Sequence, residues 1–314
     1  MKTGIVILNY NNFDDTINCI KSVDKFCLGE ELIITIVDNG SKNNSCHEIS
    51  SFLNHSDKEY EVLDTSNLFT PQKKQVVLIK SNENLGYAKG NNLGVQFLIQ
   101  QNVEYILILN NDILLTNNLI EPLRDALVKK PKIGLISPIL LNNNNEIDHN
   151  CCRINPTEKI LILESLKFLN IKIINKYLER KYLFKTNPDL IHQKIVNCDI
   201  ISGACMMAKT NTWKRLKGFD ENTFLYYEEN ILFEKLAKLN LNMSILNSTS
   251  AIHLGAKSTK KIVNAEILSI ELESLLYYMK TYRSMSTLSI ILIKGIRLFQ
   301  IFILRIYNLL KKQN

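Results

Sequence analysis

Short apolar runs alternate with segments of helical periodicity through the first half of this chain, and this alternation constrains the fold more than any other feature. The apolar runs have the length of buried strands, and the segments between them place apolar residues three and four apart. Such alternation predicts an α/β fold with a mostly parallel sheet and helices on both faces. We expect strands at residues 5–8, 33–37, 76–79, 105–109 and 133–136, and helices near 14–25, 90–100 and 118–128.

The second half of the chain is less regular. Residues 53–74 and the asparagine run at 142–145 are polar, which predicts a surface excursion and a flexible loop. Residues 157–184 are rich in Leu, Ile and Lys at helical spacing, so we expect a helical insertion there. Strands are expected again at 200–208 and 243–252, with a helix at 230–239 between them.

Polar side chains follow four of the predicted strands, at the point where each strand should end. The carboxyl ends of parallel strands meet at one edge of the sheet, where open α/β folds bind ligands. Each set alone is also typical of an ordinary turn, but four together predict one ligand crevice. The sets are Asn9, Tyr10 and Asn11; Asp38; Asn84, Gly86 and Asn91; and Asn110, Asn111 and Asp112.

Two carboxylates in these sets have distinct expected roles. Asp112 ends a fully apolar strand, and a hard oxygen ligand there suits Mg²⁺ or Mn²⁺ carrying a diphosphate. Asp38 can accept hydrogen bonds from a pyrimidine base or a ribose, or can cap a turn. Gly86, Gly90 and Gly94 share one helical face, where they would admit a phosphate or a neighbouring strand. Their spacing disfavours both a dinucleotide-binding fingerprint and a P-loop.

Candidate acid–base and phosphate-binding residues lie in the second half. Glu228 and Glu229 follow an aromatic-rich stretch at 224–227 and precede a helix. An aromatic, partly dry setting raises a carboxyl pKa and suits a general base, whereas first-turn acids are also favoured by the helix dipole alone. His253 ends a predicted strand, and Lys257 follows it. A neutral imidazole can complete a divalent metal site, and a lysine there suits phosphate.

The C-terminal segment indicates membrane contact. Residues 289–310 are strongly apolar, yet Lys294, Arg297, Arg305 and Lys312 form a narrow basic stripe on a helix. Such a helix suits the membrane interface, although packing on the protein's own core or in a dimer seam stays open. The net charge of +7 fits an anionic surface or a phosphorylated substrate.

The termini and the cysteines bound the compartment. The chain opens directly on a short strand rather than a signal-peptide hydrophobic region, and no uncharged run of 18 residues occurs. The seven cysteines contain no CxxC, so neither a zinc site nor a disulfide framework is predicted. We therefore expect a cytoplasmic protein, peripheral at the inner face of the cell membrane.

Residues 3–260 resemble glycosyltransferase family 2, in particular its bacterial rhamnosyltransferase-like branch. The matching stretches, in the family's order, are 6–12, 36–41, 82–94, 109–112, 202–207, 218–221, 224–229 and 252–258. The resemblance implies a GT-A fold, a nucleotide-diphosphate sugar donor (dTDP-rhamnose or a UDP-hexose), Mn²⁺ or Mg²⁺, and inversion at the anomeric carbon. With the sequence patterns above, we expect a GT-A catalytic domain over 1–260, with the helical insertion at about 151–195, and a helical membrane-associating segment over 261–314.

The resemblance also assigns roles to particular residues. Asp112 matches the metal-binding last acid of the family's D-x-D element, and Asn110 replaces the first acid. Glu229 matches the catalytic base and is one methylene longer than the usual Asp, with Glu228 beside it. Ile231 and Lys235 stand where the family has Asp and Arg. Nucleotide-sugar contacts are expected from Asn9, Tyr10, Asn11, Asp38, Asn84, Gly86, Asn91, Asn110, Asn111 and Lys257, and metal contacts from Asp112 and His253.

The expected acceptor is a lipid-linked oligosaccharide of a growing surface polysaccharide such as capsule or O-antigen, and nucleic acid is not an expected partner. Two other readings stay open. A nucleotidyltransferase would need a glycine-rich basic loop after the first strand, and residues 9–13 contain neither glycine nor a basic side chain. A sugar- or partner-binding module without activity is the other, because of the departures at Glu229 and Ile231. The sequence does not indicate the oligomeric state.

Overall fold

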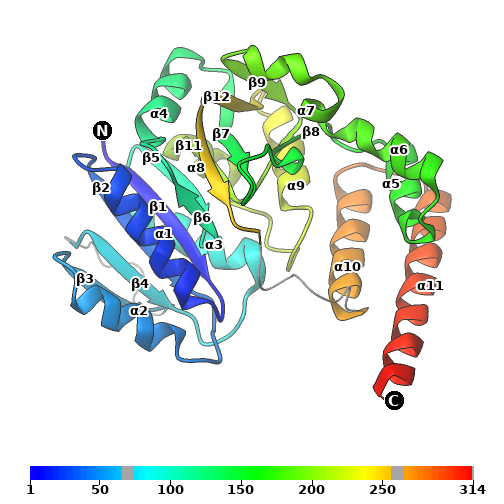
Figure 1. Ribbon diagram of the computed structural model, residues 1–314, viewed down its shortest axis with the longest axis horizontal. Coiled ribbons are helices and arrows are strands. Elements are labelled where there is room, and N and C mark those ends of the chain that lie inside the picture. The colour runs from blue at the N-terminus through cyan, green and yellow to red at the C-terminus, as the bar shows by residue number, and fades with distance from the viewer. Residues whose placement is uncertain (66–73, 256–264, 313–314) are drawn as a thin grey trace.

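A mixed sheet of ten strands forms the centre of the computed structural model, which describes residues 1–65, 74–255 and 265–312 (Figure 1). Five neighbouring strands are parallel, as predicted. They follow the order β3 (Tyr60–Asp64), β4 (Val76–Lys80), β2 (Leu32–Asp38), β1 (Thr3–Asn9) and β5 (Tyr105–Asn110).

The other half of the sheet contains the antiparallel pairs. The strand β11 (Cys205–Lys209) runs antiparallel to β5 and to β7 (Ile133–Leu141). Beyond β7 lies β12 (Asn242–His253), which is parallel to β7 and antiparallel to β6 (Ile113–Leu115) and β9 (Ile195–Cys198). Because β6 follows β5 directly and pairs with the end of β12, residues 110–113 and His253 are brought together.

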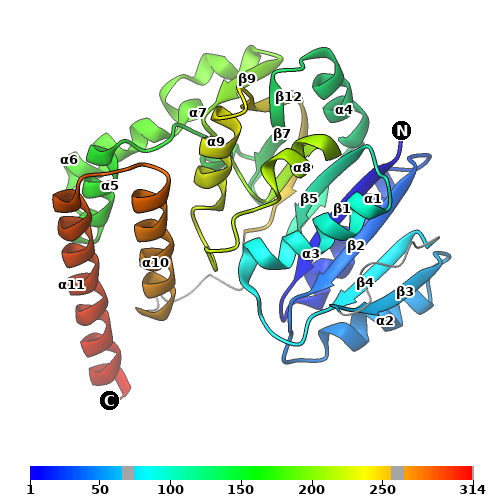
Figure 2. The ribbon, with the colours of Figure 1, turned by 180° about the vertical axis from the view of Figure 1, so that it is seen from behind.

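Helices cover both faces of the sheet. On one face lie α1 (Phe13–Phe26) and α2 (Ser45–Asn54), and α4 (Ile120–Lys129) packs on the β7 side (Figure 1). On the other lie α3 (Gly86–Gln100), α8 (Thr210–Leu216) and α9 (Glu228–Ala237) (Figure 2). A Cβ at Gly90 or Gly94 would lie 2.7 Å from Leu8 or 2.5 Å from Val6, so these glycines let α3 pack on β1 rather than admit a phosphate.

The predicted strands and helices of the first half are confirmed, with three corrections. Residues 53–74 are not only a surface excursion, because they include the end of α2 and the edge strand β3. The helix α2 was missed. The single strand predicted at 200–208 is two strands, β10 (Ile200–Ile201) and β11, because a turn at 202–204 interrupts it. The asparagine run at 142–145, which was predicted to be a flexible loop, lies in a turn after β7.

The predicted insertion is helical and lies beside the sheet. It contains α5 (Glu158–Ser165), α6 (Lys172–Leu178) and α7 (Leu183–Thr186), with single 3₁₀ turns η3 (Lys167–Leu169), η4 (Glu179–Lys181) and η5 (Pro188–His192) between and after them. Another turn, η2 (His149–Cys151), precedes the strand β8 (Cys152–Arg153). β8 pairs with β10 in a small antiparallel sheet, so the two ends of the insertion meet.

The C-terminal segment is a helical hairpin of α10 (Ala265–Thr281) and α11 (Thr287–Lys312), which stands apart from the sheet (Figure 1). It packs on the insertion through a small cluster of Leu161, Leu275, Met279 and Ile293. The hydroxyl of Tyr277 donates to Asp220 at 2.9 Å, which ties α10 to the loop before α9. The hairpin is therefore joined to the body through both the insertion and the loop that precedes Glu228 and Glu229.

Candidate active site

A cavity of about 1110 Å³ connects the strand ends to the C-terminal hairpin. Asn110, Asp112 and His253 line it on the sheet side. Glu228 and Glu229, at the start of α9, also line it, as do the insertion and the α11 side chains Ile303 and Leu304. The predicted metal residues and the predicted base residues therefore share one cavity.

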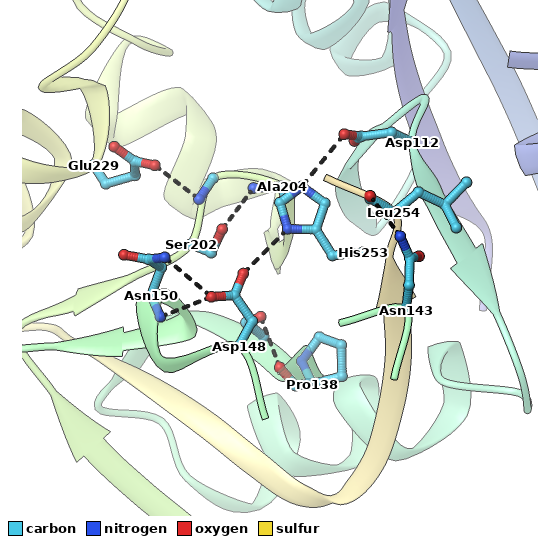
Figure 3. Close-up of polar contacts among 12 residues, drawn as sticks. Asp112, Pro138, Asn143, Asp148, Asn150, Ser202, Ala204, Glu229, His253 and Leu254 are labelled. Atoms are coloured by element: carbon cyan, nitrogen blue, oxygen red, sulfur yellow. Dashed lines mark hydrogen bonds and ion pairs between the residues drawn. The ribbon is translucent and has the colours of Figure 1, made fainter. Parts of the chain in front are cut away.

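Asp112, His253 and Asp148 form a chain of polar contacts in this cavity (Figure 3). His253 Nε2 lies 3.4 Å from Asp112 Oδ2, and His253 Nδ1 lies 3.3 Å from Asp148 Oδ2. Burial lowers the pKa of His253, but hydrogen bonds and charge from the two carboxylates outweigh it and raise the pKa to about 9. Without a metal ion, the imidazole is thus held as a cation between two acids.

The pair Asp112 and His253 fits a divalent cation. Among the described residues, no three His, Cys, Asp or Glu side chains form a preformed metal cluster. Asp112 is only 6% exposed, and its Oδ1 is buried without a hydrogen-bond partner among the residues that the structure describes. One oxygen and one nitrogen ligand leave several positions for water and phosphate oxygens, which is how Mg²⁺ binds in many phosphate-handling sites. These residues therefore suit the expected ion better than a closed structural site.

Glu229 is oriented by a backbone amide. Its Oε1 accepts a hydrogen bond from Gly203 N at 3.0 Å, and a Cβ at Gly203 would lie 2.9 Å from that oxygen. Before the helix, Tyr226 and Tyr227 both have positive φ, of 75° and 69°. Non-glycine residues adopt this backbone only where the surroundings enforce it, and such strain is concentrated at functional sites.

Glu228 occupies a different environment from its neighbour. It is 5% exposed, and within the described part of the chain its Oε1 has no hydrogen-bond partner. Burial, followed by the charge of Glu229, raises the pKa of Glu228 to about 8. At neutral pH Glu228 is therefore mainly protonated, and a protonated carboxyl cannot take a proton from a substrate.

Hydrogen bonds of Asn9, Asn11 and Asp38 join the loop after β1 to the loop after β2. Asn9 Nδ2 donates to Asp38 Oδ2 at 2.7 Å, and Asp38 Oδ1 accepts from Ser41 N at 3.0 Å. Asn11 Oδ1 accepts from Lys42 N at 2.8 Å. Asp38 lines a second cavity, of about 520 Å³, with Ser41 at the ends of β2 and β4. The strand ends share one edge of the sheet, as predicted, but they line two cavities rather than the one crevice expected. Asn9 is buried and hydrogen-bonded on β1, the strand between β2 and β5, and separates the two cavities.

The other residues expected to contact the nucleotide differ in burial and in hydrogen bonding. Asn84 Oδ1 accepts from Gly86 N at 3.0 Å, and the adjacent Tyr87 amide donates to the Phe224 carbonyl at 2.7 Å, so this turn lies against the loop before α9. Asn91 Oδ1 is buried and has no hydrogen-bond partner in residues 1–65, 74–255 and 265–312. Asn111 Nδ2 donates to Thr16 Oγ1 at 3.1 Å, and Tyr10 is 37% exposed. Lys257 lies outside the described residues.

Several residues of the site were not predicted. Asp148 lies in a polar stretch with no motif, and only its contact with His253 distinguishes it. The hydroxyl of Tyr87 donates to the Gly203 carbonyl at 2.8 Å, so both support the loop that holds Glu229. Arg153 lines the cavity, and its buried Nε has no partner within the described ranges. Arg297, expected on the exposed stripe, instead pairs with Glu271 at 3.0 Å and lines the cavity.

The fold and the cavity define a GT-A protein, the class that the sequence resembles. Residues 4–150 match the family model described as Glycosyl transferase family 2. A curated relative is the low-salt glycan biosynthesis hexosyltransferase Agl10 of Haloferax volcanii, 24% identical over 254 residues. That match covers 80% of this chain and 66% of the relative.

Solved glycosyltransferase structures share the fold. GalNAc-T7, crystallised with UDP, GalNAc and Mn²⁺, matches with a TM-score of 0.60 and 12% identity over 90% of this chain and 49% of its own. The mannosyltransferase PcManGT of Pyrobaculum calidifontis, in complex with GDP-Man and Mn²⁺, matches with a TM-score of 0.55 and 12% identity over 91% of this chain and 65% of its own. The S. aureus TarS fragment 1–349 matches with a TM-score of 0.50 and 14% identity over 90% of this chain and 73% of its own. At such identities these likenesses support the fold alone.

Proposed function

We propose that this protein is an inverting, metal-dependent glycosyltransferase that moves a sugar from a nucleotide-diphosphate donor to a hydroxyl of a lipid-linked surface-polysaccharide precursor. One observation carries the proposal: the cavity that holds Asp112 and His253 also holds Glu229, with its carboxylate oriented by Gly203. A site for the leaving diphosphate and a base for the acceptor thus line one space. The division into a catalytic domain over 1–260 and a membrane-associating segment over 261–314 belongs to the same proposal.

Asp112 and His253 would hold the divalent ion, Mn²⁺ or Mg²⁺, whose charge stabilises the diphosphate leaving group when it is bound. Arg153 adds a second argument for a phosphate-bearing ligand. Its guanidinium lines the cavity, and among the described residues its buried Nε lacks the hydrogen bond that such groups normally make. A phosphate oxygen is the acceptor that suits it best.

Glu229 is the proposed base. It would take the proton of the acceptor hydroxyl while that oxygen forms a bond to the sugar's anomeric carbon and the bond to the diphosphate breaks on the opposite face. One base suffices for this direct displacement. Glu228, being mainly protonated at neutral pH, would serve instead to bind the acceptor. Neither assignment requires the Asp and the Arg that the usual family pattern has at the positions of Ile231 and Lys235.

The helix α11 is the part of the protein proposed to contact the membrane and the lipid-linked acceptor. Its outward side chains are apolar, including Ile291, Phe299, Phe302 and Ile306, which are 41–62% exposed, and the exposed Lys294 and Arg305 lie beside them. By length and composition this helix could also cross a bilayer, and 11% of its most apolar window is buried. Basic residues along an amphipathic helix favour the interface. Because Ile303 and Leu304 of the same helix line the cavity, a lipid-linked acceptor would reach Glu229 from the membrane side.

The donor is best sought among dTDP-rhamnose, which the rhamnosyltransferase-like branch favours, and UDP-hexoses. The test is incubation of the purified full chain with each donor and Mn²⁺, followed by detection of the released nucleotide. A glycosyltransferase releases a nucleoside diphosphate even by slow hydrolysis. A nucleotidyltransferase would instead release pyrophosphate from a nucleoside triphosphate and a sugar phosphate. A binding module would release nothing, and that result would contradict the proposal.

A further inference from the structure

We propose that Asp148 is a positioning residue, which keeps a proton on Nδ1 of His253, so that Nε2, the nitrogen that faces Asp112, is the one offered to a divalent cation. This inference rests on the proposed divalent-cation site. The observation is the pair of contacts on opposite sides of one ring: Asp148 Oδ2 at 3.3 Å from Nδ1, and Asp112 Oδ2 at 3.4 Å from Nε2 (Figure 3).

The carboxylate of Asp148 is itself fixed. Its backbone amide donates to Leu140 O at 2.8 Å, at the end of β7. Its Oδ1 accepts from the backbone amide and the side-chain amide of Asn150, at 3.0 and 3.1 Å. Only Oδ2 therefore faces the ring of His253. Oδ1 of Asp148 therefore caps the turn, and Oδ2 contacts the histidine.

The chemistry of the pair dictates the tautomer. A carboxylate only accepts hydrogen bonds, and a neutral imidazole has one donor nitrogen and one acceptor nitrogen. The nitrogen that faces Asp148 must therefore be Nδ1–H, and the proton that the metal-free imidazolium carries on Nε2, toward Asp112, is the one that a bound cation would replace. Histidines that bind metals are commonly fixed in this way by a second carboxylate. Asp148 would thus decide which nitrogen of His253 is available to a cation.

Two substitutions separate this role from a purely structural one. In Asp148→Asn, the amide oxygen can still accept from Asn150, so the turn is kept, but the NH₂ group then faces Nδ1. A donor there favours the opposite tautomer and places a proton on Nε2, where the cation would bind. In Asp148→Ala, the turn loses its cap, but no tautomer is imposed. The isosteric variant should therefore damage the cation site more than the truncated one.

The experiment is calorimetric titration of the full chain with Mn²⁺ alone, with thermal unfolding of each metal-free variant alongside. We expect Asp148→Asn to weaken Mn²⁺ binding by about 10-fold or more, the range for losing such an outer partner. We expect Asp148→Ala to weaken it less, yet to unfold at the lower temperature. Asn150→Ala, which keeps the backbone hydrogen bond to Oδ1, is the matched control and should bind Mn²⁺ like the native chain.

A double-mutant comparison decides the mechanism. In a His253→Ala background, Asp148→Asn should change Mn²⁺ affinity no further, because it acts through the imidazole. Unchanged affinity in Asp148→Asn alone, or an equal loss with and without His253, would make Asp148 a turn cap and overturn the inference. The proposed function is judged separately: donor hydrolysis that proceeds with no Mn²⁺ binding to the native chain would keep the transferase and discard the inference.

Discussion

The carboxylate of Glu229 and the backbone amide of Gly203 are joined by a hydrogen bond of 3.0 Å across the boundary between α9 and the turn that separates β10 from β11. The hydroxyl of Tyr87, on α3, donates to the carbonyl of the same glycine at 2.8 Å. Three elements that are distant in sequence therefore fix one oxygen of the proposed base. The predictions below test this arrangement and the rest of the cavity.

The first prediction concerns the two adjacent acids. Glu229→Gln should keep donor and metal binding but lower the transfer rate by about 10²-fold or more, the effect of removing a general base. Glu228→Gln should affect turnover less and acceptor binding more. Steady-state kinetics with separate donor and acceptor titrations measure both effects. The reverse pattern would exchange the two roles, and two active variants would place the base elsewhere.

A second prediction follows from the space at Gly203. A Cβ there would lie 2.9 Å from Glu229 Oε1 and 3.2 Å from the Tyr87 hydroxyl, so Gly203→Ala must displace the carboxylate. We expect a fall in turnover of about 10²-fold, which a misplacement near 1 Å can cause, with little change in donor binding. Gly295→Ala is the control, since its Cβ would meet nothing within 4 Å. Normal turnover in Gly203→Ala would show that this hydrogen bond does not matter.

Asp112 carries the third prediction. Asp112→Asn should abolish transfer and greatly weaken the Mn²⁺-dependent binding of a nucleoside diphosphate, because the amide cannot serve as an anionic ligand. Calorimetry with and without Mn²⁺ measures the change, and Asp57→Ala, at an exposed site, is the control. Unchanged Mn²⁺-dependent affinity in Asp112→Asn would remove Asp112 from the cation site.

The fourth prediction is a pH dependence of stability. Burial raises the pKa of Glu228 from 4.5 to about 8, so the folded protein holds a proton there that the unfolded chain releases. Stability from this group is full below pH 4.5 and is lost as the pH rises toward 8. Glu228→Gln removes the dependence, so its melting temperature should exceed that of the native chain near pH 8, with the difference vanishing near pH 5. Parallel melting curves at all pH values would contradict the assignment.

Membrane contact gives the fifth prediction. Phe299→Ser combined with Phe302→Ser should release the protein from vesicles of anionic phospholipid without lowering its melting temperature, because both side chains are more than half exposed. Leu28→Ser, at an 82% exposed site far from α11 in sequence, is the matched control. Point changes are needed because Ile293 is buried against the insertion, so deletion of residues 289–314 would also expose the core. Unchanged vesicle binding would assign the apolar face to a protein partner.

The sequence predicted those parts of the molecule that depend on local patterns. Buried parallel strands such as 105–109 are uniformly apolar, and the motif at 109–112 marked the place of Asp112. It could not predict contacts that depend on how distant segments pack. Asp148 meets His253 only because β7 and β12 are neighbours, and Arg297 turns inward only because Glu271 lies on the adjacent helix. The edge strand β3 was missed because its burial alternates only weakly and its flanks are polar.

Arg153 pairs with Ile200, so the two ends of the insertion lie side by side. The helices of the insertion, at 154–194, begin after β8 and end before β9, which pairs with β12, so the length of this segment has little effect on the strands that carry Asp112 and His253. Loop length is inexpensive when the two ends are already held together. Arg153 and Ile200 both line the cavity. Replacing or resizing residues 154–194 as a unit would therefore change the cavity wall that faces the acceptor, while the donor side stays constant.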